Sequence, residues 1–319
     1  MFRFRSFRNT DPPLLAEIWR SRAGEPGLLQ PVSVDLFEQY VFGRMHFDYA
    51  GLILALDEDR AVGFAHASFG PDPEHNRIST ETGVTCIVVV RPDCDELAVG
   101  AGLLDRCEAY LRGRGAKVLY GGGIPPVAPF YLGLYGGCDL PGVLESDALS
   151  RQLYTARGYR EIDRVLLFRQ DLSTFRAPVD RRQMQCRRRL LVQVIMDAPT
   201  RSRWEACTAG DFDWTRFELV PRGEKQAVAY ALLRAVEWCD SSRPGRTAGL
   251  AEICVDPACR RQGLATHLIS ESFRVLSGQG VAFVDAQAAQ SQMPVVALYR
   301  KLGFQQVDQG IVYRKEVDS

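Results

Sequence analysis

The sequence predicts an α+β fold that occurs twice in tandem, each copy a mixed and mostly antiparallel sheet flanked by helices. Three observations lead to this prediction. The order of strands and helices expected in the first half recurs in the second. Each half contains an almost wholly apolar strand, at 84–90 and 250–255, followed by a polar turn and a long helix. Each half later shows the pattern Leu-Tyr-x-x-x-Gly-aromatic, at 153–159 and 298–304.

The elements of the first half follow from local patterns. An acidic turn between two apolar alternations predicts a hairpin over 51–69. The β-branched run at 84–90 is typical of a central strand that is buried on both faces. In order, we expect a strand, two helices, the hairpin, the central strand, a helix and a strand, over 2–7, 13–20, 34–42, 51–69, 84–90, 98–113 and 116–121.

The chain of 319 residues is long enough for two domains of ordinary size. We expect an N-terminal domain over 1–175 and a C-terminal domain over 189–319. The intervening 176–188 is rich in arginine and lacks apolar periodicity, which indicates a solvated linker rather than a patch for an acidic partner. The second half has one expected helix, over 199–209, before its hairpin, where the first half has two.

The composition excludes several classes of protein. The formal net charge is zero, so electrostatic attraction to nucleic acid is not expected. No apolar run approaches the roughly 20 residues that cross a membrane, and we expect no membrane partner. The nine cysteines are scattered without metal-type spacing, which fits reduced thiols in the cytoplasm. The four histidines form no ligand pattern, so no metal is expected. The oligomeric state is left open.

The stretch V-D-P-A-C-R-R-Q-G-L-A-T-H-L-I, at 255–269, is the most informative in the chain. It predicts the end of a strand, a short turn and the start of a helix. Such a turn leaves several backbone N–H groups free at the positive end of the helix dipole, which makes it an anion site. Small residues at Gly263 and Ala265 let a phosphate approach the backbone.

This turn resembles the pyrophosphate motif R/Q-x-x-G-x-G/A of the GCN5-related N-acetyltransferases (GNAT), with Arg260, Gly263 and Ala265 at the motif positions. A second motif of that family, N-x-x-A-x-x-L-Y-x-x-x-G-F, is similar to 292–304, with Gln292 where Asn is usual. The resemblance implies two GNAT-like domains, in a layout similar to mycothiol synthase, and acetyl-CoA as co-substrate. It implies that the pantetheine arm and the pyrophosphate are held by Ile253, Val255, Arg260, Arg261, Gln262, Gly263, Leu264, Ala265 and Thr266, and that Gln292 also binds the coenzyme.

The resemblance also suggests the catalytic groups for acetyl transfer to an amine. Tyr299 is the candidate acid for the departing thiolate, because a phenol donates a proton without ionising at neutral pH; the alternative is that it only packs. Glu252 is the candidate base, or else it orients the substrate or pairs with an arginine. Asp285 is a weaker alternative base, and Gly249 occupies a position where some relatives place this acid.

The two copies differ at the phosphate turn. Aligning the first copy on the family motif places Asp95, Ala98 and Gly100 where the second copy has Arg260, Gly263 and Ala265. Carboxylates there would repel a pyrophosphate, so we expect the N-terminal copy to be degenerate.

The first copy also carries a long insertion at 122–146, rich in glycine, proline and aromatic residues, which suits a ligand-facing lid or a patch that docks the other domain. The function expected is an acetyl-CoA-dependent N-acetyltransferase that acts in the C-terminal domain on a small-molecule amine or a protein N-terminus. The alternative is a non-catalytic protein that senses acyl-CoA.

Overall fold

The structure, a computed structural model, describes residues 2–236 and 245–317. Its strands form one continuous mixed sheet of 13 strands. The order across the sheet is β1-β2-β3-β4-β5-β13-β7-β12-β11-β10-β9-β8, with β6 paired to β13 off this path. Two of the strand pairs are parallel, β4 with β5 and β11 with β12, and the other named pairs are antiparallel. The α+β class expected from the sequence is therefore confirmed.

The first half contains the elements that its sequence patterns predict. They are β1 (Arg3–Ser6), α1 (Pro12–Arg20), α2 (Val34–Phe37) with the π-helical η1 (Glu38–Phe42), β2 (Leu52–Asp57), β3 (Arg60–Pro71), β4 (Ile78–Val90), α3 (Glu96–Gly113), β5 (Val118–Gly121), β6 (Val143–Leu144), α4 (Ala148–Ala156) and β7 (Arg160–Asp171).

The second half repeats that order. Its elements are α5 (Arg181–Arg189), β8 (Leu190–Met196), α6 (Arg203–Ala209), β9 (Trp214–Pro221), β10 (Ala229–Val236), β11 (Arg246–Val255), the 3₁₀ turn η2 (Pro257–Cys259), α7 (Leu264–Gly278), β12 (Val281–Ala289), α8 (Met293–Lys301) and β13 (Gln305–Glu316). Among the described residues, no helix is long and apolar enough to cross a membrane.

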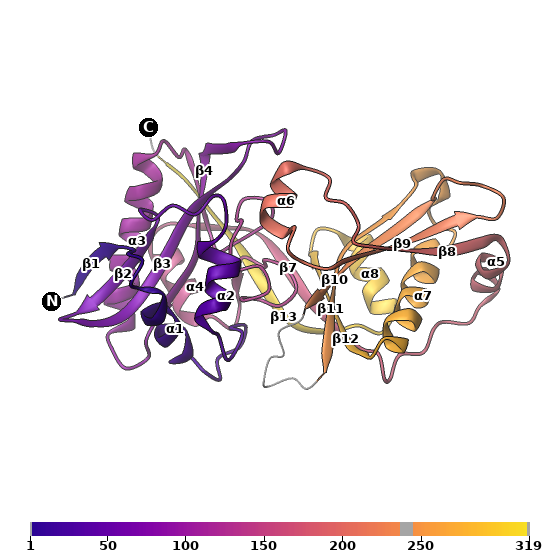
Figure 1. Cartoon of the computed structure of the whole chain (residues 1–319), viewed down its shortest axis with the longest axis horizontal. Helices are drawn as coiled ribbons and strands as arrows, with labels where there is room; N and C mark the ends of the chain where they lie inside the picture. The colour runs from indigo at the N-terminus through magenta and orange to yellow at the C-terminus, as the bar shows by residue number, and fades with distance from the viewer. Residues whose placement is uncertain (1, 237–244, 318–319) are drawn as a thin grey trace.

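The last strands of the two halves exchange partners. β7, from the first half, pairs with β12 of the second half, so that Arg169 lies opposite Asp285. β13, from the second half, pairs with β5 of the first half, so that Tyr313 lies opposite Gly121. The end of the chain accordingly reaches the first half beside α3 (Figure 1). The expected boundary at 175–189 divides the sequence, but each half completes its sheet with a strand from the other.

The segment expected to be a solvated linker contains the helix α5. Asp180 caps this helix, because its Oδ1 accepts a hydrogen bond from the N–H of Gln183 at 2.8 Å. Gln183 and Cys186 are buried against α7, and the Gln183 side chain donates to the carbonyl of Gly263 at 3.3 Å. The arginines that obscured the periodicity lie mostly on the exposed side, so a narrow buried stripe is enough to hold the helix in place.

Candidate functional site

The two parallel strands of the second half part where the co-substrate is expected. β11 pairs with β12 only as far as Leu250, opposite Ala286. Beyond that point β11 continues beside β10 alone, up to Val255 opposite Ala229. A bulge at Ala251, between the paired Leu250 and Glu252, bends the strand at the parting point. Ile253 and Val255 therefore lie on a stretch whose side toward β12 carries no strand, as an extended ligand arm requires.

The turn after β11 leaves the start of α7 open, as the expected anion site requires. The backbone enters the left-handed region at Arg261, with φ of 63°, and again at Gly263, with φ of 86°. Gly263 is the N-cap of α7 and offers no side chain to the first turn of the helix. The N–H groups of Leu264, Ala265 and Thr266 thus stand at the positive end of a 15-residue helix, and no side chain of residues 2–236 or 245–317 caps them.

The other residues expected to bind the coenzyme differ in their exposure to solvent. Arg260, Arg261 and Gln262 are exposed, and the Nε of Arg260 donates to the carbonyl of Val255 at 3.1 Å. Leu264 and Thr266 are buried and anchor the helix. Gln292 is exposed at the N-cap position of α8, and its side chain makes no capping hydrogen bond.

The corresponding turn of the first half is closed by its own carboxylate. The strands again part, since β4 pairs with β5 only as far as Thr85 opposite Gly121. Here, however, Asp95 is the N-cap of α3, and its Oδ1 accepts from the N–H of Ala98 at 3.0 Å. The motif alignment was wrong in detail: Asp95, not Ala98, takes the place of Gly263. Gly100 lies inside the helix, where a Cβ would come within 2.6 Å of Leu153.

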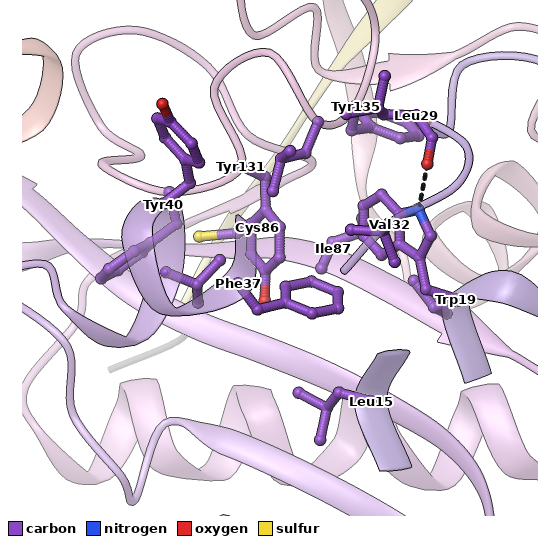
Figure 2. Close-up of a cluster of buried hydrophobic side chains, with 14 of the residues drawn as sticks. Leu15, Trp19, Leu29, Val32, Phe37, Tyr40, Cys86, Ile87, Tyr131 and Tyr135 are labelled. Carbon is purple, nitrogen blue, oxygen red and sulfur yellow. Dashed lines mark hydrogen bonds between the residues drawn. The ribbon is translucent and has the colours of Figure 1, made fainter. Parts of the chain in front are cut away.

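The insertion fills the inner face of the first half. Phe130, Tyr131 and Tyr135 are buried in the cluster that also holds Trp19 and Phe37 (Figure 2). The Tyr131 hydroxyl lies 3.1 Å from Nδ1 of His66, a buried histidine of β3. Burial lowers the pKa of His66 to about 3, so this ring is neutral. The first half therefore uses this face for packing.

The insertion then crosses to the second half. Nε2 of Gln287, on β12, donates to the carbonyls of Gly136 and Asp139 at 3.0 and 2.9 Å. Cys138 lies directly over β11, where a Cβ added to Gly249 would come within 2.7 Å of the Cβ of Cys138. An acid at position 249, as in some relatives, has no room here. The glycine permits the docking of the insertion.

The insertion, α6, β10 and β11 enclose a cavity of about 580 Å³, which we call the junction cavity. Pro125, Pro129, Leu132, Asp139 and Leu140 come from the insertion. The second half contributes Arg201, Trp204, Glu205, Trp214, Leu232, Arg234 and Glu252. The volume lies within the usual range for small-molecule sites. Figure 1 shows α6 at the junction of the two halves.

Glu252 faces this cavity with both carboxylate oxygens engaged. Oε1 accepts a hydrogen bond from the Tyr230 hydroxyl at 2.6 Å, and Oε2 pairs with the guanidinium of Arg201. Burial, followed by this hydrogen bond to Glu252, raises the pKa of Tyr230 to about 12. Asp285 instead forms a bidentate pair with Arg169, with distances of 2.7 and 2.6 Å. That fixed pair leaves Glu252 as the carboxylate of β11 and β12 that reaches the cavity.

Tyr299 lies on α8, the helix that follows β12. Its ring packs against Phe168 of the exchanged strand β7 and against Phe304, with centroids 5.5 and 5.0 Å apart. The side chain is buried, and within the described residues its hydroxyl makes no hydrogen bond. Burial raises the pKa of this phenol above its usual value. The nearby Cys138, which packs over Gly249 of β11, adds to this rise, so the Tyr299 hydroxyl lies close to the docked insertion.

Sequence reasoning missed several residues of the junction cavity. Arg201 and Trp204 reach it through long-range packing, which no local pattern reveals, whereas the insertion was expected to face a ligand or to dock the other domain. Arg234 did leave a signal, because it is the only charged residue in the apolar strand β10, Ala229–Val236.

Comparison with known proteins agrees with this geometry. The sequence model described as "Acetyltransferase (GNAT) family" matches residues 14–125 and 189–304, well over half the chain. The chain belongs to the GNAT family of acetyltransferases. The two matches coincide with the two repeated halves, so the tandem GNAT arrangement expected from the sequence is confirmed. Acetyl-CoA is the co-substrate that goes with this family. No curated protein matches the chain.

Solved structures share the fold at low identity. A GCN5-related glucosamine N-acetyltransferase region of a fungal multi-domain β-N-acetylglucosaminidase has a TM-score of 0.72 at 17% identity; 99% of this chain aligns with 38% of that one. A tandem GNAT protein from the clavulanic acid biosynthesis pathway has a TM-score of 0.67 at 15% identity, covering 100% of this chain and 99% of the other. A GNAT protein from Sphaerobacter thermophilus has a TM-score of 0.66 at 16% identity, covering 100% and 96%.

Proposed function

We propose that the C-terminal half transfers an acetyl group from acetyl-CoA to a primary amine, and that the N-terminal half binds no coenzyme. One observation carries the proposal. The helix after the parted strands has a free N-terminus at Gly263 in the second half, whereas Asp95 occupies the N-terminus in the first. In the first half the Asp95 carboxylate takes one of the N–H groups at the helix start and would repel a pyrophosphate, whereas Gly263 places no carboxylate at the start of α7.

The co-substrate would lie between β11 and β12. The backbone at Ile253 and Val255 would hydrogen-bond the pantetheine arm. The turn from Arg260 to Thr266 would hold the pyrophosphate, with Arg260 and Arg261 exposed beside it. Gln292, at the N-terminus of α8, would border the opening from the side of β12.

The transfer forms a C–N bond and breaks the thioester C–S bond. Glu252 would accept the proton that the attacking amine loses, directly or through a water. Before Glu252 can accept this proton, the ion pair between Arg201 and its Oε2 must break, while the Tyr230 hydroxyl would still hold its Oε1 in place. Tyr299 would donate its hydroxyl proton to the departing thiolate. Its raised pKa weakens it as an acid, so its contribution is a strong hydrogen bond that becomes a proton transfer as charge builds on sulfur.

The size of the junction cavity favours a small-molecule amine over a protein N-terminus as acceptor. The eight free cysteines among the described residues favour a reducing compartment, the cytoplasm, as the place of the reaction.

The test compares Tyr299→Phe with Tyr154→Phe, the matching tyrosine of the first half, in an amine panel with release of free thiol as readout. Tyr299→Phe should lower kcat by roughly 10²-fold and leave the Kd for acetyl-CoA and the melting temperature unchanged. Tyr154 donates to the carbonyl of Thr85 at 3.3 Å, so Tyr154→Phe should cost about 1 kcal/mol of stability and leave kcat intact.

Unchanged kcat in Tyr299→Phe would assign this residue to packing. Tight acetyl-CoA binding without turnover of any amine would instead support the non-catalytic sensor of acyl-CoA.

A further inference from the structure

We infer that the acceptor carries a carboxylate as well as its amine, and that Arg234 binds this carboxylate in the junction cavity. The inference rests on the proposed acetyl transfer and names the chemical class of its acceptor, an amino acid or a short amino carboxylate.

Arg234 is a buried cation, and two of its nitrogens have no hydrogen-bonding partner in the part of the chain that the structure describes. Its residue is 3% exposed, and it lines the junction cavity from β10. Its Nε and Nη2 are buried and, among the described residues, donate to no acceptor. The guanidinium lies over the ring of Phe212, with 4.8 Å between its carbon and the ring centroid. A cation–π contact offsets only part of the cost of removing a guanidinium from water.

Among the described residues, no neighbouring carboxylate forms an ion pair with Arg234. Glu252 pairs with Arg201, and Asp285 pairs with Arg169. Asp139 is near enough for Arg234 to oppose the rise in its pKa that burial causes, yet within the described residues it forms no ion pair with Arg234. One Asp139 oxygen accepts the N–H of Leu140 at 2.8 Å. The guanidinium group of Arg234 is therefore available to bind the anionic group of a ligand.

The position of Arg234 suits a bifunctional acceptor. Arg234 lies opposite Gly249, and Leu232, two residues earlier on β10, lies opposite Glu252. Side chains two apart on a strand share a face and stand roughly 7 Å apart at the backbone. A carboxylate held by Arg234 would therefore place a nearby amine toward Glu252 and the parting point of β11 and β12. Trp204, Trp214 and Leu132 supply apolar walls for the rest of the molecule.

The experiment uses matched amines that differ only in the carboxylate: phenylalanine against phenethylamine, tryptophan against tryptamine, and γ-aminobutyrate against propylamine. We expect kcat/KM for at least one acid to exceed that of its decarboxylated partner by roughly 10- to 100-fold, the range for one charge-assisted contact. Arg234→Gln should remove this preference, Arg234→Lys should keep part of it, and Arg222→Gln, at an exposed arginine outside the cavity, should leave it unchanged.

A stability readout separates binding from structure. If Arg234 serves the fold, Arg234→Gln lowers the melting temperature; if it awaits a ligand, removing an unpartnered buried charge leaves that temperature equal or higher. A lowered melting temperature, or equal use of acids and decarboxylated amines by the wild type, would overturn the inference. If no amine is acetylated, the proposed function fails, and calorimetry of the same amino acids with wild type and Arg234→Gln then decides this inference alone.

Discussion

We expect the second half to bind acetyl-CoA more tightly than the first half does, and a carboxylate placed at the N-terminus of α7 should abolish this difference. The change is Gly263→Asp, which gives α7 the N-cap that Asp95 gives α3. By analogy with Asp95 and Ala98, the new carboxylate would accept the N–H of Thr266, three residues on. It would both occupy a donor and stand beside the pyrophosphate.

The magnitude follows from Coulomb's law. A phosphate bound to the neighbouring N–H groups would lie roughly 4 Å from the new charge. At that distance, one pair of like charges costs about 1 kcal/mol in water and about 4 kcal/mol at the effective dielectric of a protein surface. The Kd for acetyl-CoA should therefore rise by roughly 5- to 800-fold for each interacting negative charge of the ligand.

Gly263→Asn is the matched control. Both substitutions place a side chain at φ of 86°, and both meet Nε2 of Gln183, 3.2 Å from the added Cβ. Asn and Asp tolerate this region better than other side chains, so the difference between the two variants isolates the charge. Calorimetric titration with acetyl-CoA measures it, and circular dichroism melts confirm that both variants fold. Equal Kd values for the Asp and Asn variants would refute the assignment of the pyrophosphate to this turn.

Two further predictions concern the insertion. Gly249→Ala should displace Cys138 and raise the KM for the acceptor more than the KM for acetyl-CoA. Because the clash is between two Cβ atoms, the double variant with Cys138→Gly should recover the wild-type KM for the acceptor. Equal effects on both KM values would contradict the role of the insertion as a wall of the acceptor site. Burial lowers the pKa of His66 to about 3 in the folded state, so between about pH 6.5 and pH 3 this histidine binds a proton only in the unfolded state. The free energy of unfolding should therefore fall as the pH drops through this window, by about 2 kcal/mol at pH 5. Denaturant titrations at pH 7 and pH 5 should show this loss in the wild type and a smaller one in His66→Gln; equal losses would contradict it.

The sequence predicted the repeated elements and the phosphate turn because those depend on local patterns. Apolar alternation marked β2 and β3, and the Arg260–Gly263–Ala265 spacing marked the start of α7. The exchange of β7 and β13 could not be predicted, because both strands keep the same pattern whichever sheet they join. Pairing partners depend on contacts between residues more than 100 positions apart.

The acceptor side was the part least accessible to sequence reasoning. The role of Gly249 becomes clear only when Cys138 is seen above it. Arg234 was overlooked although a lone arginine in an apolar strand is an unusual feature, and its unpartnered state is visible only in three dimensions. The helix α5 was missed because its buried stripe is mainly Gln183 and Cys186, neither a strong apolar marker.

The central claim is that one chain holds one coenzyme site, in the second half. Isothermal titration of the intact chain with acetyl-CoA tests it most directly, because the exchanged strands rule out a test on separate halves. We expect a stoichiometry of about one per chain for the wild type, and for Gly263→Asp a Kd raised by the factor worked out above from Coulomb's law. A stoichiometry of two, or one site that survives in Gly263→Asp with unchanged affinity, would place acetyl-CoA at the turn of α3 and contradict the account.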